Sequence, residues 1–121
     1  MPYRTHVLPT LTAAGTVAGS ALGTVTSYAP IFGEIKGIFL DYGGTATTTD
    51  VVISAANFGG TILAVSNNVT NGWYYPTVQA HNGTAGTIDA YIWPPIADYV
   101  RAVLTQGSAG DTLDTTVLVE F

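Results

Sequence analysis

Histidine and serine are the first residue types to consider for chemistry, because a catalytic serine needs a histidine beside it and a carboxylate to orient that histidine. The sequence contains two histidines, His6 and His81. His6 lies in an expected extended segment near the N-terminus, and His81 lies at the end of an expected strand. No Gly-x-Ser-x-Gly segment is present to place a serine on a nucleophile turn. The pattern favours two exposed histidines and no catalytic triad.

Carboxylate pairs are a second possible source of chemistry, since two carboxyl groups can act as acid and base on a glycosidic bond. The nearest candidates in sequence are Asp111 with Asp114 and Asp41 with Asp50. Aspartates in loops commonly accept hydrogen bonds from their own backbone, which favours a role in turns. The sequence also lacks cysteine and any EF-hand-like spacing, so it predicts no thiolate site and no calcium loop. We therefore expect no enzyme, no cofactor and no metal site.

Aromatic rings could instead bind a partner, and three consecutive ones occur in the stretch NNVTNGWYYPTVQAHNG at residues 67–83. Period-two alternation divides this stretch between the two faces of a strand. One face carries Tyr74, Pro76, Val78 and Ala80, and the other carries Trp73, Tyr75, Thr77, Gln79 and His81. The first set suits a core, whereas the second mixes aromatic and hydrogen-bonding groups, as interfaces do. The predicted interface residues from this stretch are Trp73, Tyr75, Gln79 and His81.

The last two expected strands also alternate between an inward and an outward face. The inward positions of the first are Ile96, Val100, Ala102 and Leu104. Tyr99 and Arg101 lie on its outward face, and both join the predicted interface. The inward positions of the second are Leu113, Val117, Val119 and Phe121. We therefore expect Phe121 to anchor the C-terminus in the core.

The elements that must position these residues are short β-strands, because period-two alternation recurs and no window shows a helical stripe with caps. The expected strands are residues 23–29, 33–42, 50–54, 61–66, 73–80, 88–93, 97–105 and 113–121, with residues 5–12 as an extended arm or edge strand. Polar and glycine-rich turns separate them. The sequence predicts an all-β chain folded as a single antiparallel β-sandwich, jelly-roll-like, with seven to eight strands. It spans residues 1–121, with residues 1–15 as a candidate N-terminal arm.

Charge is unusually sparse for a soluble domain. Charged residues make up 9% of the 121 residues, against about 25% in ordinary domains. The three basic residues, Arg4, Lys36 and Arg101, are far apart in a chain of net charge −5. Phosphate binding needs clustered basic residues, so nucleic acid is not an expected partner. A surface poor in charge and rich in apolar residues favours burial between subunits, and we expect a homo-oligomer.

Residues 7–33 carry no charge, and Gly15, Gly19 and Gly23 recur at the spacing of a transmembrane helix face. The same segment contains Pro9, Pro30 and many serines and threonines, so it lacks the continuous apolar character of a membrane span. The N-terminus MPYRTHVLPT also lacks the basic and apolar regions of a secretory signal. We expect neither a membrane segment nor a signal peptide.

Several segments resemble small β-rich virion structural proteins of tailed bacteriophages. They are GEIKGIFLDYGG, TTTDVVIS, NNVTNGWYYPTVQAHN and ADYVRAVLTQGSAGDTLDTTVLVEF, and the likeness covers roughly residues 20–121. The resemblance implies a capsid decoration (cement) protein, made in the host cytoplasm and located on the capsid exterior. Its implied partner is the major capsid protein, and its implied oligomer is a trimer.

Two other functions fit the same residues. In a carbohydrate-binding β-sandwich module, Trp73 and Tyr75 would stack against sugar rings. In a phage tail or head-spike subunit, the same face would contact other structural proteins. Both alternatives stay open at the level of the sequence.

Overall fold

The computed structural model covers residues 1–121 and describes residues 2–17, 19–44, 46–81, 84 and 86–121. Within these ranges the chain is all-β, without a helix. The strands are β1 (Tyr3–Val7), β2 (Leu11–Thr12), β3 (Ala21–Thr26), β4 (Ile31–Gly43), β5 (Asp50–Ala55), β6 (Thr61–Val65), β7 (Gly72–Tyr74), β8 (Val78–His81), β9 (Thr87–Ile92), β10 (Pro95–Asp98), β11 (Val100–Gly107) and β12 (Thr112–Glu120). In this described part, no helix is long and apolar enough to cross a membrane.

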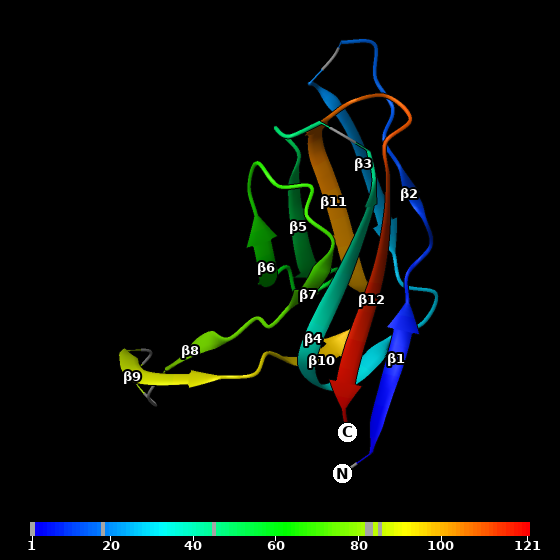
Figure 1. Cartoon of the computed structure of the whole chain (residues 1–121). Helices are drawn as coiled ribbons and strands as arrows, with labels where there is room; N and C mark the ends of the chain where they lie inside the picture. The colour runs from blue at the N-terminus through cyan, green and yellow to red at the C-terminus, as the bar shows by residue number, and fades with distance from the viewer. Residues whose placement is uncertain (1, 18, 45, 82–83, 85) are drawn as a thin grey trace.

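Two antiparallel sheets form the sandwich (Figure 1). The first has the order β1-β12-β4-β10, with β2 also paired to β12 and β7 also paired to β4. The second has the order β3-β11-β5-β6. The predicted all-β antiparallel sandwich is confirmed. The described residues form twelve strands in place of the expected seven to eight, because the candidate arm at 5–12 forms two strands and two of the eight expected strands are each divided into two.

Proline accounts for two of these divisions, since it cannot donate a hydrogen bond to a β-ladder. Pro9 lies between β1 and β2, and Pro76 lies between β7 and β8. The third division has another cause. The segment expected as one strand over 97–105 changes sheet at Tyr99, so that β10 pairs with β4 whereas β11 pairs with β3 and β5. Alternation carries no information about which sheet a strand joins.

The core lies between the two sheets and follows the expected alternation except at a register shift in β4, where Ile35 and Ile38, three residues apart, are both buried. In the first sheet, Ile35, Ile38 and Leu40 of β4 and Val117 and Val119 of β12 are fully buried. These strands pair along most of their length, with Ile38 opposite Val117. The nearly continuous apolar run expected at 33–42 is therefore a central strand, with neighbours on both edges.

The second sheet supplies the opposite wall of the core. Its buried side chains include Val51, Ile53, Val100, Ala102 and Leu104. The inward faces assigned from the sequence to β11 and to positions 113, 117 and 119 of β12 are confirmed.

Phe121 is a correction to the sequence prediction. It follows the end of β12 and is 50% exposed. The Arg4 guanidinium lies 4.7 Å from the centre of its ring, so the ring covers an arginine on the surface. Pairing of β12 with β1 and β4 holds the C-terminal segment in place instead.

The N-terminal segment is an edge strand of the first sheet. Residues 3–7 pair with β12 from Tyr3 opposite Glu120 to Val7 opposite Thr116. Leu8, which follows β1, is buried, as is Leu11 in β2. Of the two expected forms of residues 5–12, arm or edge strand, the structure has the edge strand.

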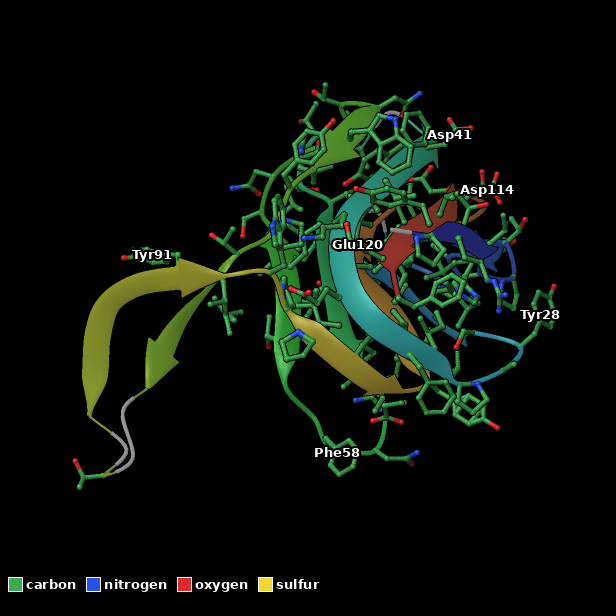
Figure 2. All side chains as sticks on the ribbon, turned by 90° about the horizontal axis from the view of Figure 1, so that it is seen from below. Tyr28, Asp41, Phe58, Tyr91, Asp114 and Glu120 are labelled. Carbon is green, nitrogen blue, oxygen red and sulfur yellow. The ribbon has the colours of Figure 1, made fainter. Side chains whose placement is uncertain are left out.

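The β8–β9 ribbon extends away from the sandwich, as Figures 1 and 2 both show. Val78 pairs with Ile92, and Gln79 pairs with Tyr91. Within the described ranges, these two strands form a separate two-stranded sheet.

Candidate functional site

The outward face of the first sheet carries the aromatic residues singled out in the sequence. Strand β7 pairs with β4 so that Trp73 lies opposite Phe39 and Tyr74 lies opposite Ile38. The Trp73 and Phe39 rings meet edge to face, with centroids 5.3 Å apart and planes at 63°. Such a contact stabilises a ring pair by about 0.5–1.5 kcal/mol beyond area burial. The pairing therefore fixes the Trp73 ring on this face.

Gly37 lies directly beneath the rings of Trp73 and Tyr75 on this face. A Cβ at this position would lie 3.1 Å from Cε3 of Trp73 and 3.5 Å from Cε1 of Tyr75. Because glycine has no side chain, both rings can lie against the strand backbone. Trp73 nevertheless stays 42% exposed and Tyr75 64% exposed. We call Phe39, Trp73 and Tyr75, together with Gly37 beneath the last two, the aromatic face.

Tyr74 points the other way, as the alternation predicted, and packs against the core. Its hydroxyl donates a 2.8 Å hydrogen bond to the carbonyl oxygen of Thr70 and accepts one of 2.6 Å from Nδ2 of Asn68. The Asn68 side-chain oxygen also accepts a hydrogen bond from the Thr70 N–H. Tyr74 thus ties the turn before β7 to the strand and anchors its neighbour Trp73.

A row of polar side chains crosses the same sheet beside the aromatic face. Asp41 lies two residues beyond Phe39 on β4, and it pairs in register with Asp114 of β12. Nδ2 of Asn71 donates to Asp41 at 3.1 Å, and the Thr10 hydroxyl donates to Asp114 at 2.5 Å. Figure 2 shows the two carboxylates near one another. We call Thr10, Asp114, Asp41 and Asn71 the polar row.

Successive outward positions on a strand are roughly 6.8 Å apart, twice the rise per residue. The polar row and the aromatic face are therefore adjacent on one surface. This arrangement offers aromatic rings for an apolar surface and oxygen and nitrogen atoms for hydroxyl groups. Among the residues with described placement, no group of three or more His, Cys, Asp or Glu could hold a metal ion.

The predicted interface residues do not all gather at this site. Trp73 and Tyr75 form part of it. The side chains of Gln79 and His81 lie outside the described part of the structure. Arg101 belongs to β11, between Thr26 and Ser54 of the second sheet, and Tyr99 lies where the chain changes sheet. Their role as an interface stays a prediction.

Other members of the site were missed in the sequence. Phe39, Gly37 and Asn71 gave no signal of their own, because their importance depends on the pairing of β4 with β7. Lys36 also lies on this strand, with its Nζ 4.7 Å from the centre of the Trp93 ring. A cation over an indole face is a favourable contact. It places a second tryptophan near the same strand.

Of the residues considered for catalysis, Asp41 and Asp114 belong to the polar row, whereas His6, Asp50 and Asp111 lie elsewhere. His6 lies on β1, where partial burial lowers its pKa. The Asp50 carboxylate accepts a 2.9 Å hydrogen bond from the Asn67 backbone N–H. Asp111 likewise accepts one of 2.9 Å from the Ser108 N–H. These two aspartates hold turns, which is the role expected for loop aspartates.

No protein-family model matches the chain, and no curated protein matches it. Among solved structures, it is similar to a variant of a family 29 carbohydrate-binding module, at 8% sequence identity and a TM-score of 0.49, covering 99% of this chain and 92% of that chain. A second variant of that module has 11% identity and a TM-score of 0.48, over 99% and 92%. The carbohydrate-binding module CBM6cm-2 from Cellvibrio mixtus lichenase 5A, in complex with cellotriose, has 10% identity and a TM-score of 0.41, over 98% and 97%.

Proposed function

We propose that the chain is a non-catalytic carbohydrate-binding module whose site is the aromatic face and the adjoining polar row. The observation that carries the proposal is the position of the Trp73 and Tyr75 rings against the bare backbone of Gly37. A ring supported from below is held in one place yet keeps surface for a ligand. Little conformational entropy is then lost when the ligand binds.

The chemistry of a pyranose ring matches both parts of this surface. Its axial C–H groups form an apolar face that can be buried against an aromatic ring. Its hydroxyl groups project around the edge, where carboxylate and amide groups of the polar row can form hydrogen bonds. Hydrogen bonds to a carboxylate are stronger than those between neutral groups. The two parts together favour a sugar over a purely apolar ligand.

The carboxylates narrow the class of sugar. Asp41 and Asp114 are direct cross-strand partners, and like charges in such a position repel one another. A uronate or a sulfated sugar would add a further negative charge at the same place. The ligand expected at this site is therefore a neutral polysaccharide.

Affinity electrophoresis with soluble polysaccharides tests the proposal. The purified chain should be retarded in gels containing a neutral glucan or mannan, such as hydroxyethylcellulose or glucomannan, and not in gels containing alginate. Trp73→Ala should abolish the retardation and leave the far-ultraviolet circular dichroism spectrum unchanged. Tyr28→Ala is the matched control, because Tyr28 is 79% exposed on the loop between β3 and β4. Absence of binding to every neutral polysaccharide tried would overturn the proposal.

A capsid decoration subunit is the second candidate, supported by the projecting β8–β9 ribbon. Tyr91 and Ile92 on this ribbon are 65% and 45% exposed, and an extended ribbon of this kind can reach a neighbouring protein. On this proposal the ribbon contacts the major capsid protein and stabilises the shell. Cryo-electron microscopy of virions from the encoding phage is the test. The chain should lie on the outer surface of the head, and its absence from virions would reject this function.

A further inference from the structure

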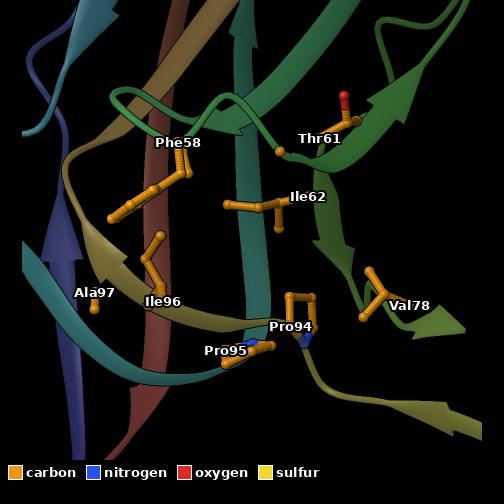
Figure 3. A pocket seen from close by; sticks show the side chains of 10 residues that line it. Phe58, Thr61, Ile62, Val78, Pro94, Pro95, Ile96 and Ala97 are labelled. Atoms are coloured by element: carbon orange, nitrogen blue, oxygen red, sulfur yellow. The ribbon is translucent and has the colours of Figure 1, made fainter. Parts of the chain in front are cut away.

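An apolar groove opens on the opposite end of the sandwich from the polar row, at the root of the β8–β9 ribbon. Its volume is about 470 Å³. One wall comes from the end of β5, the turn after it and β6, and includes Phe58, Thr61 and Ile62. The other wall comes from the segment around β10 and from Val78 (Figure 3). The groove thus lies between elements of both sheets.

Hydrogen bonds to a buried carboxylate fix the turn that exposes the Phe58 ring at the rim of this groove. Phe58 is 80% exposed, although hydrogen bonds hold its turn in place. The buried Asp98 carboxylate accepts hydrogen bonds from the backbone N–H groups of Asn57 and Phe58, at 2.8 and 2.9 Å. It also accepts one from the Asn57 side chain, at 2.9 Å. A large exposed aromatic residue on a fixed turn beside an apolar groove has the form of a binding anchor.

The occupant of the groove should be uncharged, because the described residues that line it include no ionisable side chain. The chain itself has a net charge of −5, so two copies repel one another least where the surfaces in contact are neutral. Tyr91 and Ile92, the exposed side chains that the structure describes on the ribbon strands, are aromatic and apolar. These two side chains match the groove in chemistry, and a charged peptide would find no pairing group among the described lining residues.

The ribbon also needs a partner for its own stability. A two-stranded ribbon alone in water is marginally stable, and within the described ranges β8 and β9 pair only with each other. Both overall views show the ribbon pointing away from its own sandwich. Val78 at the base of the ribbon lines the groove of its own copy, whereas Tyr91 and Ile92 stay exposed. A second copy of the chain supplies a ribbon for the groove and a groove for the ribbon.

We propose that the β8–β9 ribbon of one copy binds in the groove beside Phe58 of a second copy of this chain. Each copy has one ribbon and one groove, so two copies can seat each other's ribbons in a two-fold dimer, or several copies can do so head to tail in a ring. The aromatic face stays outside this contact. The proposal is thus independent of carbohydrate binding, and either can fail without the other.

Sedimentation velocity over a concentration series, with the full chain and two surface variants, is the first test. Tyr91→Ser alters the ribbon and Phe58→Ser alters the groove, and both side chains are exposed, so the fold should be kept. The wild-type chain should associate reversibly, and each variant should weaken association by about tenfold or more. Tyr28→Ser should behave as the wild type. A monomer at every concentration, or association unaffected by both variants, would overturn the proposal.

Cross-linking gives an independent test, because the chain contains no cysteine. Thr61→Cys places a thiol at the groove, and Thr84→Cys places one in the turn between β8 and β9, so that Tyr91 is kept. Mixing the two single variants with a short bismaleimide should give covalent dimers. The pair Tyr28→Cys and Thr84→Cys is the matched control and should give few. Equal yields from both mixtures would contradict seating of the ribbon in the groove.

Discussion

The carboxylate of Asp98 accepts a 2.9 Å hydrogen bond from the backbone N–H of Phe58, and so a buried charge fixes an exposed ring. The same carboxylate accepts hydrogen bonds from the N–H groups of Asn57 and Tyr99. It lies at the point where the chain leaves the first sheet for the second. One side chain therefore holds both the change of sheet and the turn beside the groove.

Asp98→Asn should lower the stability of the fold. An amide has one acceptor oxygen and one donor nitrogen, so at least one of the N–H groups that now meet the carboxylate would face another donor. An unmet donor in a buried place is destabilising. The midpoint of urea denaturation should fall, and hydrogen exchange at the Phe58 amide should become faster. An unchanged midpoint would show that the carboxylate is not needed by the turn.

The same network predicts a dependence of stability on pH. Burial alone would raise the pKa of Asp98, but the hydrogen bonds from Phe58, Asn57 and Tyr99 outweigh it and lower the pKa below the ordinary 3.8. A lowered folded-state pKa contributes stability that is fully present above pH 3.8 and is lost as the pH falls through the folded value. Urea denaturation between pH 6 and pH 2 should therefore show a smaller acid loss in Asp98→Asn than in the wild type. Parallel curves for the two proteins would contradict this assignment.

Loss of the hydroxyl should change the stability of the fold in opposite directions at Tyr42 and Tyr74, which lie on neighbouring strands. Tyr42 packs against the core, burial raises its pKa, and its hydroxyl is buried without a hydrogen-bond partner among the described residues. Tyr42→Phe should stabilise the fold by about 1 kcal/mol, since it removes an unmet polar group. Tyr74→Phe should cost about 1 kcal/mol or more, because it removes two hydrogen bonds.

Chemical denaturation of both single variants is the measurement, and each serves as the control for the other. Both substitutions remove one oxygen from a tyrosine of the same sheet and keep its aromatic ring. The burial of the ring therefore contributes equally to the two comparisons. Destabilisation of the same size in both would mean that Tyr42 has a partner after all.

Removal of residues 117–121 should abolish soluble expression. The deletion takes away the buried side chains of Val117 and Val119 and the pairing of this part of β12 with both β1 and β4. Deletion of Phe121 alone is the control. It loses an exposed ring and its contact with Arg4, which should cost under about 1 kcal/mol. Solubility of the longer deletion would show that β12 is not essential to the sandwich.

The sequence predicted which face of a strand is buried better than it predicted which strands pair with one another. Alternation identified the inward positions of β11 and most of those of β12, because a half-buried strand buries every second side chain. It placed Phe121 in the core for the same reason, but a strand's pattern does not say where pairing ends. It likewise could not show that the segment 97–105 changes sheet at Tyr99, because both of its halves bury the same face.

The candidate site shows the same limit. Trp73 and Tyr75 were found because aromatic residues are conspicuous in a strand, and Tyr74 was separated from them by alternation. Phe39 and Gly37 were not found, since they are brought to Trp73 by pairing between strands more than thirty residues apart. Register between distant strands depends on the whole fold, and no local pattern in one sequence encodes it.

Gly37→Ala tests whether support from below makes the aromatic face a binding surface. The added Cβ would lie 3.1 Å from Cε3 and 3.4 Å from Cζ3 of Trp73, and 3.5 Å from Cε1 of Tyr75. Contacts this close require the rings to move by a few tenths of an ångström, which the exposed rings can do without unfolding the sheet. We expect a folded protein with altered tryptophan fluorescence and polysaccharide affinity reduced by about fivefold or more, as small displacements in a preorganised site are costly. Gly72→Ala on β7 is the control, because a Cβ there meets nothing within 4 Å. Full affinity in Gly37→Ala would mean that the position of the rings on the sheet does not determine binding.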